Sequence, residues 1–209
     1  HLRRFRGRGS ERFRSGSHHR IAFRLRFICR KHNFYVPEET LASRYEKEHI
    51  NFRNWVDTGI VTATPGGVID QNYIYEDIAQ AIELYKPFAL YYDPWHSSEL
   101  LKRLEEDFPK LLQVPFAQGL KNMSPATKDY EEQIYKQKII DPNPVIKWML
   151  GNVVVKPDNN GNYKPLKVSP ASTKRIDGII TSIMALKACR EQVPQVHQYK
   201  DFSALLNSF

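Results

Sequence analysis

The sequence has little cysteine and no long apolar run. Its 209 residues include only two cysteines, Cys29 and Cys189, which are far apart and lack the spacing of a metal site. We therefore expect ordinary reduced thiols of a cytosolic protein. No apolar stretch reaches the roughly 18 residues that a membrane helix needs, and no signal-peptide pattern follows the basic N-terminus. The sequence thus predicts a cytoplasmic location and no membrane partner.

Several motifs of well-known enzymes are missing too. The sequence contains no Gly-rich phosphate loop, no Cys/His metal cluster and no nucleophile elbow. Its hydrophobic content of 41% and charged content of 26% suit a soluble globular domain. The length allows one good core and a small appendage. Carboxylates are left as the candidates for chemistry.

The positive charge is confined to one end of the chain. The formal net charge is +8, yet residues 1–31 carry ten Arg and one Lys against one acid, Glu11, which gives +10. The remaining residues therefore carry a net charge of −2. A DNA-binding face in this remainder must be a local patch and not a global positive field.

The Arg-rich segment 1–31 allows three interpretations. It mixes Arg with Gly, Ser and Phe without any period up to Ser17, and then alternates apolar residues with Arg over 21–28. It can be a basic arm that binds nucleic acid by charge and stacking. It can equally be a solvated tail without a role, or the product of a slipped reading frame.

From His32 onward the pattern is that of an ordinary folded domain. Apolar, β-branched runs predict strands, and apolar residues at three- and four-residue spacing predict helices. The expected strands cover 32–36, 60–64, 88–93 and 111–116, and the expected helices cover 37–49, 70–85, 97–107, 124–138, 144–150 and 176–189. An Asn-Gly turn predicts a hairpin over 152–168. The alternation predicts an α/β domain with a central mixed sheet flanked by helices.

Two acids stand at positions that suit chemistry. The apolar run 89–92 ends on Asp93, because Pro94 stops the strand, and open α/β sheets place their sites at such strand ends. Asp177 directly precedes the last apolar helix. Mg²⁺ or Mn²⁺ prefers one or two carboxylates, with water and substrate phosphate as further ligands. Alternatively, Asp93 only starts a turn and Asp177 only complements the helix dipole.

From about His32 to Ala188 the chain resembles the C-terminal nuclease domain of tailed-phage terminase large subunits. The resemblance rests on short motifs whose order and spacing extend over about 150 residues. These motifs are Phe34-Tyr35-Val36-Pro37-Glu38-Glu39, Trp55-Val56-Asp57-Thr58-Gly59, Thr64-Pro65-Gly66, Tyr92-Asp93-Pro94-Trp95, Gln118-Gly119, Met123-Ser124-Pro125, Pro144-Val145-Ile146-Lys147-Trp148-Met149, Asn152-Val153-Val154-Val155 and Arg175-Ile176-Asp177-Gly178.

The resemblance implies a ribonuclease-H-like fold and a metal-dependent endonuclease that cuts concatemeric DNA during genome packaging. It implies double-stranded DNA, the terminase ATPase domain, the small terminase subunit and the portal as partners, in the cytoplasm of a bacterial host. The Gly-Lys-Ser/Thr motif of the ATPase domain does not occur in this sequence. We divide the chain into an atypical segment 1–31, a nuclease-like domain 32–190 and a tail 191–209.

The family places three acids at its two-metal site. Asp93 and Asp177 match two of them, with Asp93 expected to bridge the ions and Asp177 to complete one coordination shell. The flanking Lys121, Lys167, Lys174 and Arg175 are expected to hold DNA phosphates; the alternative is an ordinary solvated basic surface.

The third acid, on the first strand, has no clear match. That strand should precede His32, where Glu11 is the only acid. Arg codons of the CGN type, read one base later, encode Val, Ala, Asp, Glu or Gly, so a slipped frame would convert an acidic strand into Arg-rich sequence. Without this acid we expect Mn²⁺ binding but little cleavage. A catalytically inactive fragment and a basic-arm nucleic-acid-binding module are the alternative functions.

Overall fold

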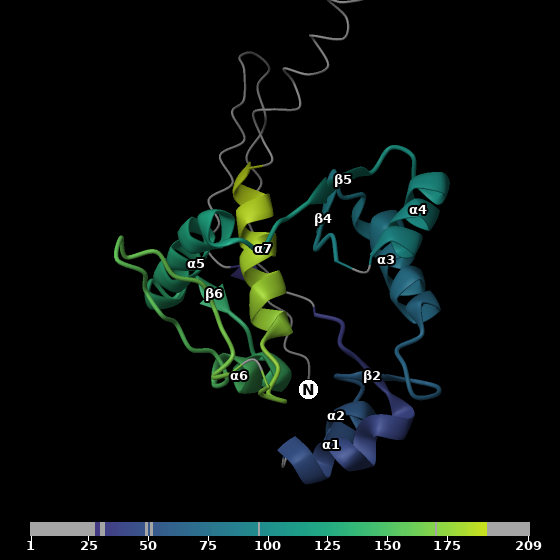
Figure 1. Ribbon diagram of the computed structural model, residues 1–209. Coiled ribbons are helices and arrows are strands. Elements are labelled where there is room, and N and C mark those ends of the chain that lie inside the picture. The colour runs from purple at the N-terminus through teal and green to yellow at the C-terminus, as the bar shows by residue number, and fades with distance from the viewer. Residues whose placement is uncertain are drawn as a thin grey trace, which may run out of the picture.

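The computed structural model describes residues 28–29, 32–48, 50, 52–95, 97–169 and 171–191. Helices and short strands alternate in this part of the chain, which confirms the α/β class (Figure 1). The helices are α1 (Leu41–Glu48), preceded by the 3-10 helix η1 (Glu38–Thr40), α2 (Phe52–Asp57), α3 (Gln71–Tyr85), α4 (Ser98–Asp107), α5 (Leu120–Tyr135), α6 (Pro144–Leu150) and α7 (Asp177–Glu191). The strands are β1 (Ile28–Cys29), β2 (Tyr35–Pro37), β3 (Thr62–Thr64), β4 (Ala89–Tyr92), β5 (Leu112–Pro115) and β6 (Ile139–Ile140).

The described strands pair two by two. β1 pairs with β6, β2 with β3, and β4 with β5, each time in parallel. The described residues thus do not form the single central mixed sheet that the sequence predicts, and β4 has β5 as its one partner among them. Parallel strands need a crossover connection, which α4 supplies between β4 and β5. The strands are short and β4 is only half-buried. Beyond β5, β4 also contacts helix α7.

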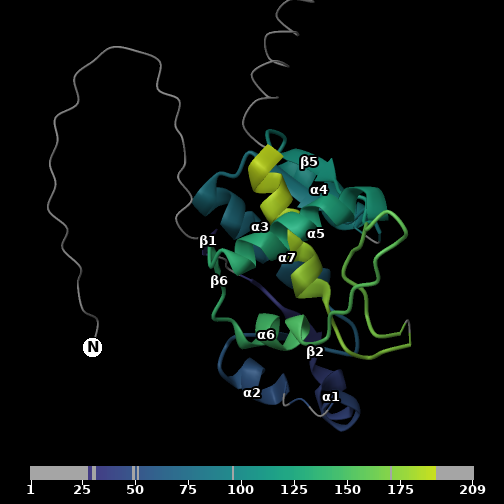
Figure 2. The same cartoon turned by 90° about the vertical axis from the view of Figure 1, so that its left-hand side faces the viewer.

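Helix α7 is the centre of the core. It contacts α5, α6 and β4, and two perpendicular views show it running through the middle of the molecule (Figures 1 and 2). Ile179, Ile183 and Leu186 are at most 2% exposed, as expected for a helix that is apolar on several sides. Among the described residues, neither α7 nor any other helix is long and apolar enough to cross a membrane.

Side-chain caps fix the starts of two helices. Asp70 accepts a hydrogen bond from the Asn72 N–H over 2.9 Å and so caps α3, where the sequence predicts a helix start. Asn143 caps α6 by accepting from the N–H of Val145, with Pro144 in the first turn. These short-range signals place both helices within one or two residues of their predicted starts.

Helix α5 begins earlier than predicted. The sequence suggests a start at Ser124, because Pro125 would occupy the first turn; instead Gly119 is the N-cap and Pro125 lies inside the helix. Proline removes one backbone hydrogen bond there. Buried neighbours such as Met123, which is 0% exposed, anchor this turn in the core. Tertiary packing therefore overrides the local proline signal.

The predicted hairpin over 152–168 is present in reduced form. Val154 and Leu166 form one antiparallel bridge, with two backbone hydrogen bonds of 2.9 Å. The Asp158 carboxylate accepts from the N–H groups of Asn160 and Asn162, and Gly161 has the positive φ of 72° that this turn requires.

The start of the described domain is joined to a distant loop. The His32 ring contacts the Asp141 carboxylate over 2.6 Å, and both side chains are largely buried. Asp141 directly follows β6, whose partner is β1. The two contacts together fix β1 and His32 against residues 139–141.

Candidate functional site

Asp93 directly follows β4, and two hydrogen bonds orient its carboxylate. Oδ1 accepts from the Trp95 N–H over 3.1 Å, and Oδ2 accepts from Nε2 of Gln118 over 2.5 Å. The contact to Trp95 forms a turn, while the main-chain oxygen of Asp93 accepts from the Ser97 hydroxyl over 2.9 Å. Asp93 therefore starts a turn, and its carboxylate has a fixed orientation at a strand end. Its role in chemistry stays a prediction.

Gln118 brings a third segment of the chain to this carboxylate. Strand β5 lies beside β4 and continues alongside it, since the Phe116 N–H donates to the Tyr92 oxygen over 2.7 Å. The main-chain oxygen of Gln118 in turn accepts from Nζ of Lys164 over 2.8 Å. The sequence motif contained Gln118 but gave it no role; only the pairing of β4 with β5 indicates that it reaches Asp93.

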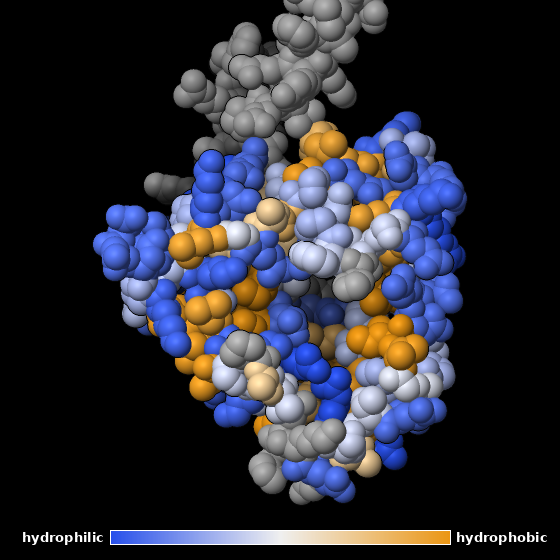
Figure 3. Space-filling view, viewed as in Figure 1, coloured by the Kyte–Doolittle hydropathy of each residue, from blue (hydrophilic) through white to orange (hydrophobic). Residues whose placement is uncertain are grey.

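Asp177 opens α7 and is exposed to solvent. It lines a cavity of about 360 Å³ together with residues of β2, α1, α2 and α6. This face of the molecule is hollowed near its centre in the space-filling view (Figure 3). An exposed acid in the first turn also complements the helix dipole. The position of Asp177 is therefore also compatible with the alternative that it only stabilises the start of α7.

Close contact with α6 fixes the first turn of α7. A Cβ at Gly178 would lie 2.7 Å from Cδ1 of Ile146 and 2.9 Å from Sδ of Met149. The Gly178 N–H also donates to that sulfur over 3.1 Å. The absence of a side chain at this position therefore lets the two helices approach, which fixes the backbone beside Asp177.

The surroundings of Asp93 and Asp177 differ. Asp93 does not line the cavity beside Asp177. Strand β4 contacts α7. Glu191, the last residue of α7, acts on Tyr91 of β4, and burial together with the Glu191 carboxylate raises the pKa of Tyr91. Asp177 stands at the opposite end of this helix. Within the described ranges no three acidic, histidine or cysteine side chains form a group that could hold a metal ion. Binding of one ion by both carboxylates remains a prediction.

The basic candidates lie in three places. Lys121 is exposed in the first turn of α5, Lys167 is half-buried after the hairpin bridge, and Lys174 and Arg175 precede α7. Within the described part of the chain, none of the four side chains forms an ion pair. Their charge is therefore not neutralised by a neighbouring described carboxylate. The third acid is a different case, because Glu11 and nearly all of segment 1–31 lie outside the described residues.

Residues 32–192 match the family model described as "Terminase large subunit, endonuclease domain". The match covers most of the chain and includes both candidate acids. The chain therefore belongs to the family of terminase large subunit endonuclease domains.

Two relatives and one solved structure show how the chain compares with longer proteins. It is 30% identical over 163 residues to the large terminase subunit of Enterobacteria phage HK97, covering 78% of this chain and 32% of that protein. It is 32% identical over 160 residues to the protein YmfN of Escherichia coli K12, covering 73% of this chain and 34% of YmfN. The crystal structure of the HK97 large terminase superposes with a TM-score of 0.66 at 28% identity, covering 74% of this chain and 32% of that one. The chain thus spans about a third of the length of these relatives.

Proposed function

We propose that this chain is the metal-dependent DNA endonuclease domain of a phage terminase large subunit, with a ribonuclease-H-like arrangement, and that it cuts concatemeric DNA during genome packaging. The observation that supports this most is the carboxylate of Asp93, held by Gln118 at the carboxyl end of a parallel strand pair. Sites of α/β sheets lie at such ends. Membership of the endonuclease family supports the same chemistry.

The cofactor of this proposed reaction is Mg²⁺ or Mn²⁺, with the carboxylates of Asp93 and Asp177 as its protein ligands. These ions are commonly bound by one or two carboxylates, with water and phosphate oxygens as the other ligands. Asp93 offers the remaining lone pairs of two oriented oxygens, and Asp177 offers an exposed carboxylate. When bound, the ions would supply a hydroxide nucleophile and stabilise the leaving oxygen.

The chain's own residues have separate roles in this proposal. Asp93 would be the bridging ligand, because its strand end and two N–H donors hold it in one orientation. Asp177 would complete one coordination shell from the first turn of α7. Because the described ranges contain no group of three acidic, histidine or cysteine side chains that could hold a metal ion, we expect Mn²⁺ to bind while cleavage stays weak.

The partners follow from the same proposal. Double-stranded DNA would contact Lys121, Lys167, Lys174 and Arg175 through its phosphates, since such contacts do not depend on sequence. The terminase ATPase domain, the small terminase subunit and the portal would be the protein partners, in the cytoplasm of a bacterial host.

A plasmid-nicking assay in Mn²⁺ tests the proposed reaction. Asp93→Asn should abolish nicking, because the amide removes the charge that a metal ligand needs. Its thermal unfolding should stay close to that of the parent chain. Glu105→Gln is the matched control, since Glu105 is an exposed acid on α4, and it should nick like the parent. Nicking by Asp93→Asn at the parent rate would refute the assignment.

The alternative functions predict other results in the same experiment. An inactive terminase fragment would bind DNA without nicking it, whatever residue stands at position 93. A basic-arm module would lose DNA binding, with a large fall in salt dependence, when residues 1–31 are deleted. A nuclease domain does not require that loss.

A further inference from the structure

The cavity beside Asp177 collects side chains from parts of the chain that are far apart in sequence. Arg44 of α1 and Arg175, which precedes α7, both line it, together with aromatic residues of β2, α2 and α6. We propose that Arg44 and Arg175 together bind one backbone phosphate group of DNA in this cavity. The nucleic-acid ligand rests on the proposed function, whereas the phosphate-binding chemistry follows from the cavity itself.

Contacts with Thr40 and Phe52 help to orient Arg44. Its Nε–H donates to Oγ1 of Thr40 over 3.1 Å. Its guanidinium carbon lies 5.6 Å from the centre of the Phe52 ring, a distance at which a cation is attracted to an aromatic face. An arginine held in this way loses little conformational freedom when it binds a ligand.

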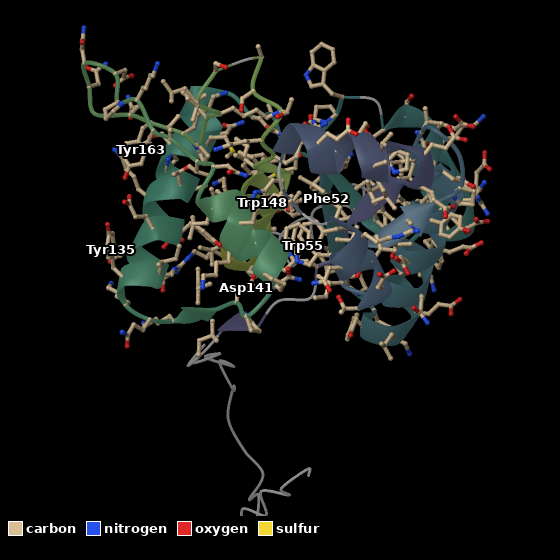
Figure 4. All side chains as sticks on the ribbon, turned by 90° about the horizontal axis from the view of Figure 1, so that it is seen from below. Phe52, Trp55, Tyr135, Asp141, Trp148 and Tyr163 are labelled. Atoms are coloured by element: carbon tan, nitrogen blue, oxygen red, sulfur yellow. The ribbon has the colours of Figure 1, made fainter. Side chains whose placement is uncertain are left out.

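The aromatic wall that supports Arg44 is itself rigid. Phe52 packs edge-on against Trp148 and against Trp55, with ring centres 5.5 and 5.3 Å apart. Figure 4 shows the three rings gathered where α2 meets α6. Phe52 is only 6% exposed and Trp148 lines the cavity. This cluster therefore fixes the position of the Arg44 side chain relative to α6.

Arg175 enters the cavity from a backbone that is also fixed. Its main-chain oxygen accepts from Nδ2 of Asn152 over 3.0 Å, and Asn152 is buried. The next residue, Ile176, is 6% exposed and belongs to the core. The Arg175 side chain is half-buried, so a charge there is less screened by water than on an open surface.

The described residues that line the cavity include two arginines and one acid. Arg44 and Arg175 supply guanidinium groups to it, and Asp177 supplies a carboxylate. Tyr35 also lines the cavity. A tyrosine is uncharged at neutral pH even at its ordinary pKa, and burial and the hydrogen bond to Asp77 raise the pKa of Tyr35 further. Guanidinium groups bind phosphate oxygens through paired N–H donors. A phosphate held by Arg44 and Arg175 would lie beside Asp177, where a cleaved strand must pass in the proposed reaction.

The test is DNA affinity, measured by fluorescence anisotropy with a labelled 12-base-pair duplex in EDTA over a range of NaCl concentrations. Arg44→Gln and Arg175→Gln should each weaken binding about tenfold at low salt. Each should also reduce the slope of log K against log[NaCl] by about 1, because one phosphate contact is lost. Arg44→Lys should recover only part of the affinity, since an ammonium group does not form the paired contact.

Arg53→Gln is the matched control, because Arg53 is exposed on the neighbouring helix α2 and does not line the cavity. It should keep the parent affinity within the error of the measurement. An equal loss from Arg53→Gln and Arg44→Gln would overturn the inference, and so would an unchanged affinity of a folded Arg44→Gln chain. Because no metal is present, a failure of nicking leaves this result unaffected, and the two proposals can fail separately.

Discussion

The side-chain amide of Gln118 donates a hydrogen bond to the Asp93 carboxylate over 2.5 Å and thereby fixes the acid that ends β4. Partners that orient a metal ligand commonly change metal affinity ten- to a hundredfold when removed. We predict that Gln118→Leu weakens Mn²⁺ binding about tenfold, as measured from the electron paramagnetic resonance signal of free Mn²⁺. Gln113→Leu is the control, since Gln113 donates to a main-chain oxygen of α4. Equal Mn²⁺ affinities of the two variants would contradict an orienting role for Gln118.

Lys174 and Arg175, the basic pair before α7, should contribute to DNA binding independently of the DNA sequence. Replacing Lys174 and Arg175 together by Gln should weaken DNA binding by the same factor for AT-rich and GC-rich duplexes, because phosphate contacts carry no base information. Filter binding at two salt concentrations is sufficient to measure this. A loss confined to one of the duplexes would point to base contacts, and unchanged affinity at low salt would exclude the pair from the interface.

Gly178 predicts a change in stability. In Gly178→Ala the new methyl group would lie 2.7 Å from Cδ1 of Ile146, so side chains of α6 must shift. Overpacking of this kind costs about 1–3 kcal/mol, which urea unfolding can measure. Gly151→Ala is the control, because its Cβ would lie 3.4 Å from the nearest atom, and it should unfold like the parent. A Gly178→Ala variant of parent stability would show that the neighbouring side chains make room for the methyl group without cost.

Tyr35 predicts a dependence of stability on pH. Its hydroxyl donates to Asp77 over 2.5 Å, and burial together with this bond raises its pKa from 10.0. The unfolded chain therefore loses the proton first, so the contribution of Tyr35 to stability is present below about pH 10 and falls as the pH rises above it. Tyr35→Phe should make the decline in unfolding free energy between pH 9 and 11 shallower. An identical decline in both chains would mean that Tyr35 titrates alike in the folded and unfolded states.

Replacing the Arg-rich segment 1–31 by its neighbouring reading frame should raise nuclease activity. If a slipped frame replaced the acidic first strand, then a chain whose residues 1–31 are encoded in the neighbouring frame should nick plasmid DNA faster in Mn²⁺ than the chain as it stands. Sequencing of the source DNA around these residues tests the premise directly. An intact frame with no acidic strand in the neighbouring frame would remove the hypothesis.

Local signals predicted much of this fold. The carboxylate of Asp70 and the amide of Asn143 cap α3 and α6 through groups two residues away, so a short stretch of sequence contains the whole interaction. The proline signal at Pro125 failed, because burial of the preceding turn outweighs it. The pairing of strands could not be predicted either. The order of apolar and polar residues along a strand indicates how buried the strand is, but not which strand lies beside it.

The candidate site shows the same division. Asp93 and Asp177 could be chosen from sequence because each stands at the end of a predicted element. Gln118 and Arg44 could not, because Gln118 reaches Asp93 through the pairing of β4 with β5. Arg44 reaches the cavity only when α1 folds next to α6 and α7. Both depend on tertiary contacts that no local pattern contains.

The contact between His32 and Asp141 has a consequence for the order of folding. It joins residues 109 positions apart, and β1 meets β6 at the same place. Closing so long a loop is entropically costly, and such distant contacts form slowly. During synthesis this junction has to wait until the ribosome has released Asp141, whereas β4, α4 and β5 can assemble from one continuous stretch of chain. The first residues of the domain to be synthesised are therefore among the last to be fixed in place.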